Sequence, residues 1–265
     1  LAMYRGAGGG VAGSLIADMR IGDTTSHIEL NGTLPRGGTS LEVGMRAMNV
    51  VPAALARMSP AFANYAMFDA PIGATGTLNM RTDGSVASAQ LMLEAGKGTF
   101  TLPGLEQAPV ALEKAHAEIA LDALAHRLDL KQLVLQAGPH SVSLVGHVDY
   151  TLGAGLNVSS ARVELTGGKT ATQMAGFFEG PVELDDIRFN GLLDFDKRSL
   201  SIDEVSLGVA GGGRIAAAGT IGEGARSPSV DMSGTLTSIP VETVRAIWPL
   251  PLSHNAREWV SEHMK

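Results

Sequence analysis

The chain has 265 residues, of which 33 are glycine and 5% are aromatic, and its formal net charge at pH 7 is −7. This glycine content and a charged fraction of only 18% disfavour a helix bundle and a disordered acidic tail, and are typical of many short strands joined by tight turns. The basic residues are scattered singly, whereas nucleic-acid binding needs a clustered Lys/Arg face, so we expect no nucleic-acid partner. The length allows one extended β domain or two compact ones.

The amino-terminal part alternates apolar and polar residues in short stretches. Residues 14–21, 27–34 and 41–45 are predicted to be antiparallel strands, because clusters of turn-forming residues separate them. A proline stands on either side of residues 53–58, which are mostly strong helix formers, and the first turn of a helix tolerates proline. The pattern therefore predicts one short helix at 53–58.

The next stretch, residues 72–102, returns to strands, and Asp83-Gly84 predicts a hairpin turn within it. Residues 110–130 are ambiguous, because they contain several helix formers while Ala117, Ile119 and Leu121 alternate as in a strand. We favour a strand, since a clear strand pattern occupies the equivalent place in a later repeat.

The second half of the chain continues as strands over 142–165 and 187–236, with a second short helix predicted at 170–178. The tail, 241–265, has a helical pattern and contains both tryptophans. Residues 1–240 are accordingly expected to form one repeating β region, followed by a helical segment at 241–265.

Two long-range repeats support this organisation. Residues 49–60 match residues 238–249, and both read as strand, proline, short helix and proline. The other repeat is an apolar ladder with the pattern Arg-(x)-Leu-x-Leu/Ile-x-x-Leu/Val-x-Leu, whose two copies are 72 positions apart. Its apolar positions are Leu128, Leu130, Leu133 and Leu135 in one copy and Leu200, Ile202, Val205 and Leu207 in the other.

Each ladder gives a strand one apolar face and one polar face. A closed sandwich or barrel would bury the apolar face as an ordinary core. A sheet that curls into an open trough would instead leave this face available to an acyl chain. The periodicity is the same in both cases, so it leaves the two interpretations open.

The sequence offers little for catalysis or metal binding. Cysteine is absent, which excludes disulfides, thiolate metal sites and cysteine nucleophiles. The seven histidines form no zinc-binding pattern, and no Gly-x-Ser-x-Gly elbow occurs. Asp194 and Asp196 stand beside a predicted turn, where aspartate accepts local backbone hydrogen bonds. We expect no catalytic residue, metal or cofactor, and hence not an enzyme.

Two further segments, together with the ladder, resemble the AsmA-like superfamily of envelope proteins, which includes TamB-like and YhdP-like proteins. One is Gly211-Gly212-Gly213-Arg214-Ile215-x-x-x-Gly219-Thr220-Ile221, and the other is Ile247-Trp248-Pro249-Leu250-Pro251-Leu252-x-x-x-Ala256-Arg257-Glu258-Trp259-Val260. The tail is the more specific of the two. The resemblance implies that the helical segment at 241–265 leads into a further repeat beyond this chain. The resemblance covers most of the chain in its β-repeat character but only these segments in motif.

The resemblance implies a mainly β, elongated and curled antiparallel groove with a few short helices. It implies a periplasmic location in a Gram-negative bacterium, an inner-membrane anchor in a region outside this internal segment, and transfer of phospholipid between the inner and outer membranes. Acyl chains bind through apolar area removed from water, so such a groove needs no reactive group. The expected lining residues are Leu128, Leu130, Leu133, Leu135, Leu200, Ile202, Val205 and Leu207, followed by Val142, Leu144, Ile187 and Phe189.

The rival hypothesis is a structural β-repeat, such as an adhesin-like solenoid with a closed core and no lipid transport. Solenoid coils recur every 20 to 30 residues or so, whereas the repeats here are far longer.

Overall fold

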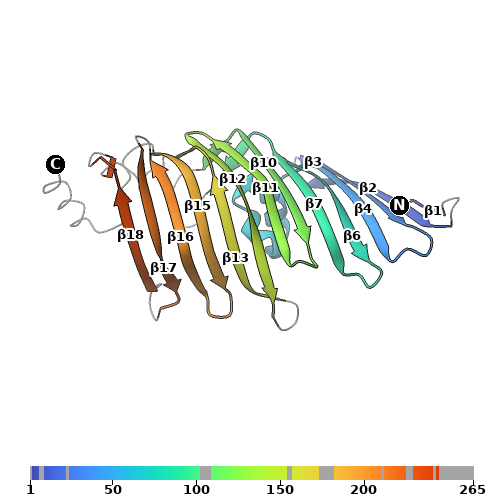
Figure 1. Cartoon of the computed structure of the whole chain (residues 1–265). Coiled ribbons are helices and arrows are strands. Elements are labelled where there is room, and N and C mark those ends of the chain that lie inside the picture. Colours follow the sequence, from blue (N-terminus) through green and yellow to red (C-terminus); the bar gives the residue numbers. More distant parts are fainter. Residues whose placement is uncertain are drawn as a thin grey trace. The chain divides into compact units, whose positions relative to one another are not determined.

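The computed structural model describes residues 2–5, 9–21, 24–101, 109–153, 157–172, 182–209, 212–224, 229–240 and 243–244. These residues form a mainly β, antiparallel structure with short helices, which confirms the predicted fold class (Figure 1). The chain divides into two compact units, Leu1–Gly138 and Pro139–Lys265, and each is described by itself.

The first unit is built on one large antiparallel sheet. Its strands follow the order β1-β2-β3-β4-β6-β7-β10-β11, so neighbours in the sheet are also close along the chain. Their bounds are β1 Ala2–Arg5, β2 Val11–Ile21, β3 Thr24–Leu34, β4 Ser40–Val50, β6 Ile72–Arg81, β7 Val86–Ala95, β10 Lys114–Asp122 and β11 Arg127–Ala137.

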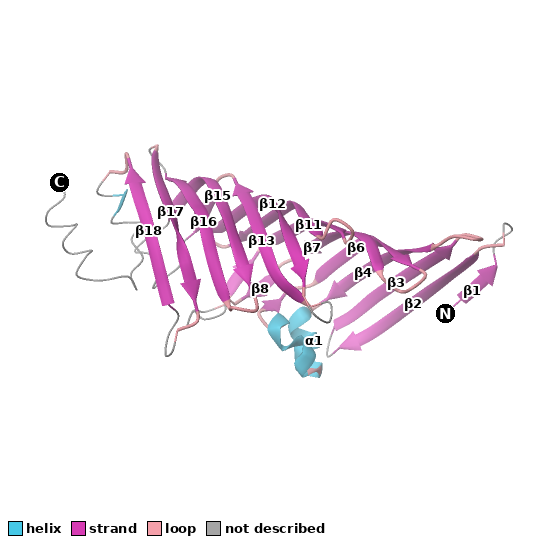
Figure 2. Ribbon diagram, turned by 60° about the horizontal axis from the view of Figure 1, so that its bottom comes forward, coloured by secondary structure: helices cyan, strands magenta, loops and turns pink. Residues whose placement is uncertain are grey.

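Two connections of this sheet carry smaller elements. The predicted helix at 53–58 is confirmed as α1, Pro52–Met58, with proline in its first turn, and a 3-10 helix, Pro60–Tyr65, follows it. Near α1 lies a second sheet, of which Figure 2 labels the strand β8. That sheet has the order β5-β8-β9. Its strands are β5 Phe68–Asp69, β8 Gly98–Phe100 and β9 Val110–Leu112.

The ambiguous stretch at 110–130 forms strands β9, β10 and the start of β11, so the choice of strand over helix is confirmed. The hairpin predicted at Asp83-Gly84 joins β6 to β7. Gly84 adopts a φ of 86°, in the left-handed region that glycine enters without steric cost, and Asp83 Oδ1 accepts a hydrogen bond from the Ser85 N–H at 2.8 Å.

The second unit also contains an antiparallel sheet, with the order β12-β13-β15-β16-β17-β18. A short strand, β14, pairs with β12 and β15 beyond the end of β13. The bounds are β12 His140–Leu152, β13 Val158–Gly167, β14 Thr170–Thr172, β15 Val182–Asp194, β16 Ser199–Val209, β17 Gly213–Gly222 and β18 Ser229–Thr237.

The helix predicted at 170–178 is wrong for its first three residues, which form β14. Ala171 pairs with Ser141 on one side and with Glu183 on the other, so the strand fills a place between two longer strands. This tertiary pairing outweighs the local helix propensity. The rest of that segment lies outside the described residues. So does the predicted helical tail, except for Thr243 and Val244, which are helical.

Candidate functional site

The large sheet of the first unit has one apolar face and one polar face. Adjacent strands are in register so that apolar residues stand opposite one another, as in the row Leu93, Ala117 and Leu133 across β7, β10 and β11. The row Ile28, Ala47 and Ala74 continues the same face across β3, β4 and β6. The polar face carries the alternate residues of every strand.

The break in the ladder, written x-x in the sequence, is a β-bulge. Ile119 of β10 pairs with Leu130, and Glu118 pairs with Gln132, so Lys131 is the extra residue of β11. In the second copy, Gly191 pairs with Ile202 and Asn190 pairs with Glu204, so the extra residue is Asp203. A bulge keeps the apolar residues on both sides of it on one face, because it absorbs the odd residue.

The sheet of the second unit repeats this separation of faces. Leu165, Phe189 and Val205 stand opposite one another across β13, β15 and β16. Leu144 pairs with Gly167, which in turn pairs with Ile187, and Val142 has the same strand parity as Leu144.

The structure thus places all twelve predicted lining residues on the apolar face of their own unit. Four of them lie in the first unit on β11, and eight lie in the second unit on β12, β15 and β16. Contact of these residues with lipid stays a prediction.

Few apolar side chains of the described residues are fully buried. Leu128, Leu133 and Leu200 are only half-buried, and Val230 of β18 is 62% exposed. If these apolar faces formed a closed core, most of their large side chains would be shielded from water. The buried apolar residues are Ala53, Ala54, Ala70, Phe100, Leu112, Ala137, Ala161, Val182, Ile202, Val209 and Val244.

One part of the apolar face in the first unit is covered. Phe100 and Leu112 of the three-stranded sheet form a buried cluster with Ala70 and Ala137, and Leu135 packs against it. Phe100 also stacks on Phe68, with ring centroids 6.3 Å apart. The small sheet therefore closes the end of the apolar face where β11 ends, and this is the local core of the unit.

The second unit has an apolar cavity of about 440 Å³ at the ends of β15, β16 and β17. Leu193, Leu200 and Ile221 contribute to it from the apolar face, and Phe195 contributes from the turn. Phe195 is 51% exposed although it stands between charged residues. The sequence analysis did not predict that Phe195 lines a cavity. The available signal was an aromatic residue inside a charged hairpin turn.

An ion pair borders this cavity. Arg198 donates to Glu223 Oε1 at 3.2 Å, and both residues line the cavity. Arg198 adopts a φ of 50° in the turn between β15 and β16. The lining of the cavity therefore combines apolar side chains with an ion pair.

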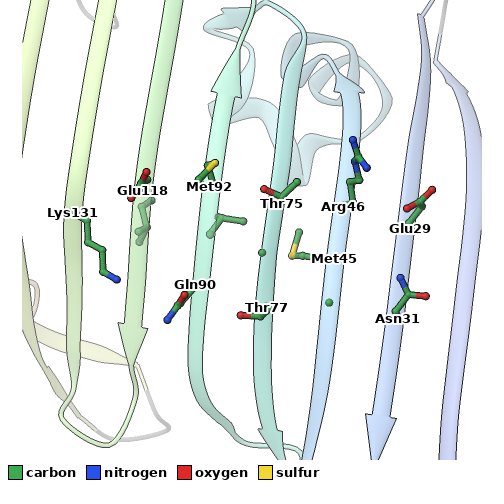
Figure 3. Close-up of a pocket in the computed structure, with 14 residues that line it drawn as sticks. Glu29, Asn31, Met45, Arg46, Thr75, Thr77, Gln90, Met92, Glu118 and Lys131 are labelled. Carbon is green, nitrogen blue, oxygen red and sulfur yellow. The ribbon is translucent and has the colours of Figure 1, made fainter.

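The polar face of the first unit contains a hollow of about 500 Å³, which the sequence did not predict (Figure 3). Several of its lining residues are small, including Gly44, Thr75 and Thr77. Figure 3 shows Glu29, Asn31 and Arg46 on one side of the threonines and Gln90, Met92, Glu118 and Lys131 on the other.

Three histidines on the polar faces share one arrangement. His27 lies between Asp18 Oδ1 at 2.6 Å and Glu29 Oε1 at 2.9 Å, and hydrogen bonds from these two carboxylates raise the pKa of His27. His116 and His147 also each have an acidic residue two positions later and another on the neighbouring strand. Their acidic neighbours are Glu118 and Glu94 for His116, and Asp149 and Glu164 for His147.

In the part of the chain that the structure describes, no three His, Cys, Asp or Glu side chains are grouped so as to hold a metal ion. None of the described helices is long and apolar enough to cross a membrane. Comparisons with protein-family models, with curated proteins and with solved structures found no match.

Proposed function

We propose that the chain binds phospholipid acyl chains on the apolar faces of its sheets. On this proposal it is a segment of a periplasmic protein, anchored in the inner membrane of a Gram-negative bacterium outside this segment, that conducts lipid between the inner and outer membranes. It carries out no reaction, needs no cofactor and binds no nucleic acid.

The observation that carries the proposal is the half-exposed apolar face within each unit. Leu133 and Leu200 each stand in rows of apolar residues that neighbouring strands extend, yet neither side chain is buried. Large contiguous apolar surfaces on a folded protein are typical of binding sites, because leaving them in water is unfavourable. An acyl chain offers a matching apolar surface without requiring hydrogen bonds.

The cavity at the ends of β15, β16 and β17 supports the same ligand. Its lining is largely apolar and includes the exposed Phe195, and Arg198 and Glu223 add a charged pair to it. A phospholipid has the same combination of an apolar chain and a charged headgroup. Ligand pockets commonly combine an apolar lining with a few polar groups that fix the orientation of the ligand.

The test is mass spectrometry of organic extracts from the chain purified from a Gram-negative host. We expect phospholipid in the wild-type extract and little in the extracts of Leu133→Asn and Val205→Asn. Both changes place a polar amide on the apolar face without altering net charge, and an unpaired amide in an apolar contact is costly.

Matched controls come from the opposite faces of the same two units. Val134 alternates with Leu133 on β11, and Val145 is 44% exposed on the polar side of β12. Val134→Asn and Val145→Asn should retain lipid. Circular dichroism must show that all four variants are folded. A folded wild-type chain that carries no phospholipid would contradict the proposal.

A structural β-repeat with a closed core is the second candidate. The buried cluster around Phe100 and Leu112 favours it, because the small sheet there covers part of an apolar face as a core would. On this alternative, Leu133→Asn would lower stability without any change in bound lipid, because no lipid would be bound in either protein.

A further inference from the structure

The hollow on the polar face of the first unit has the form of an extended binding surface. Its lining residues come from six neighbouring strands, β3, β4, β6, β7, β10 and β11. Five interstrand spacings of about 4.8 Å give it a length of 24 Å across the sheet. Thr75 and Thr77 lie between the longer side chains (Figure 3), and these short residues leave the space that the longer side chains surround.

Within the described part of the chain, several polar side chains around this hollow form no hydrogen bond or ion pair with another residue. Other polar side chains of the sheets are paired, as Arg162 is with Asp203 at 2.6 Å. Glu29 and Glu118 accept from histidines at 2.9 and 3.3 Å. The described residues provide no hydrogen bond or ion pair to the remaining polar lining side chains, which are Asn31, Arg46, Thr75, Thr77, Gln90 and Lys131.

The chemistry of these groups excludes several ligands. An acyl chain would bury amide, guanidinium and hydroxyl groups without replacing their bonds to water, which is unfavourable. A simple anion would meet Glu29 and Glu118, and a simple cation would meet Arg46 and Lys131. An extended peptide would find no free backbone groups at the centre, because β6 is paired on both sides with β4 and β7.

We propose that this hollow binds a linear oligosaccharide. A sugar hydroxyl both donates and accepts, so it can accept from Arg46 and Lys131 and donate to Glu29 and Glu118. The amide of Gln90 and the guanidinium of Arg46 are planar groups, and each carries two adjacent polar atoms. The spacing of those two atoms suits adjacent hydroxyls on a sugar ring. Met92, 41% exposed, offers an apolar contact to the C–H groups of the ring.

This inference does not depend on lipid binding, because the hollow lies on the polar face of the first unit and the predicted lining residues of that unit, on β11, lie on its apolar face. The ligand class follows from the mixed charge and the unpaired side chains. The extent of the hollow calls for a chain of several sugar rings rather than one.

The experiment is a titration of the isotopically labelled full chain with chitotetraose, maltotetraose or cellotetraose, followed by NMR of the backbone amides. We expect at least one of the three to give saturable shifts at Thr75, Thr77 and Gln90. Arg46→Ala and Gln90→Ala should each weaken binding about tenfold, the effect of losing a hydrogen bond that involves a charged or planar polar group.

Matched control variants lie on the same face outside the hollow. Arg20 of β2 and Gln136 of β11 are exposed and do not line it. Arg20→Ala and Gln136→Ala should leave saccharide affinity unchanged. The proposal is overturned if none of the three saccharides shifts these amides, or if the controls weaken binding as much. Shifts produced there by inorganic phosphate or by phospholipid micelles, with the saccharides silent, would also overturn it.

Discussion

Asp122 and Asp194 hold equivalent positions in two hairpin turns that are 72 positions apart. Asp122 Oδ1 accepts from the backbone N–H of Ala125 at 3.0 Å, and Asp194 Oδ1 accepts from that of Lys197 at 2.9 Å. The turn residues that follow, His126 and Arg198, have positive φ angles of 53° and 50°. The sequence repeat therefore includes the turn, its aspartate and the bulge after it, so the repeating unit is a whole hairpin.

The change Asp122→Ala should lower the free energy of unfolding by about 1 kcal/mol, because the turn loses its acceptor for two backbone N–H groups. Chemical denaturation of the two proteins measures this difference. Leu124→Ala is the control, since Leu124 is 75% exposed. An equal loss in the control would mean that the aspartate does not stabilise the turn.

The bulge predicts an asymmetry between two single-residue deletions in β11. Deleting Lys131 should be tolerated, because Leu130 and Leu133 then alternate regularly and stay on the apolar face. Deleting Asp129 should disrupt the pairing of β11 with β10, because Leu128 would move to the polar face. Thermal unfolding followed by circular dichroism tests both. Equal melting temperatures for the two deletion variants would contradict the assignment of the bulge.

Replacing each of two glycines on neighbouring strands by alanine should lower the stability by very different amounts. A Cβ at Gly76 would overlap the carbonyl oxygen of Gln90, whereas a Cβ at Gly44 would have its nearest neighbour, the carbonyl oxygen of Asn31, 3.9 Å away. Gly76→Ala should cost about 1 to 3 kcal/mol, as overpacking does, and Gly44→Ala should cost far less. Urea unfolding curves give both values. A tolerated Gly76→Ala would show that β6 and β7 lie farther apart.

The raised pKa of His27 predicts a pH-dependent stability. The protonated imidazole is held by Asp18 and Glu29, so its contribution is complete below the unfolded value near 6.5 and is lost as pH rises through the folded pKa. The stability difference between wild type and His27→Gln should therefore be larger at pH 5.5 or so than at about pH 8.5.

An NMR titration of the His27 ring provides a direct measurement. The midpoint should lie above the ordinary value of 6.5 in the wild type and fall in Asp18→Asn, which removes the partner at 2.6 Å. A wild-type midpoint at or below 6.5 would rule out the ion-pair arrangement.

Alternation was enough to predict the strands and the face on which the ladder lies. Leu128, Leu130, Leu133 and Leu135 share a face as predicted, because a period of two is a local property of the chain. The nature of the break at Lys131 was not predicted. A bulge is defined by the partner strand, and the sequence of one strand does not contain that information.

The hollow on the polar face was also not predictable from the sequence of single strands, because it depends on several strand pairings at once. Asn31, Arg46 and Gln90 come together because three successive registers, β3 with β4, β4 with β6 and β6 with β7, align them. Each register depends on turns and connections between the strands. The same dependence explains Thr170–Thr172, whose strand exists only because β12 and β15 have edges free beyond β13.

The meandering strand order has a consequence for how the chain folds. In the sheet of each unit, partners are either consecutive strands or strands separated by one connection, such as the connection between β4 and β6 that contains α1, the 3-10 helix and β5. Such local pairing lowers the loop-closure entropy that must be lost before contacts form, so each unit can assemble hairpin by hairpin. Duplicating one hairpin also lengthens a sheet without rearranging any existing pair, which makes the number of strands an easily evolved quantity.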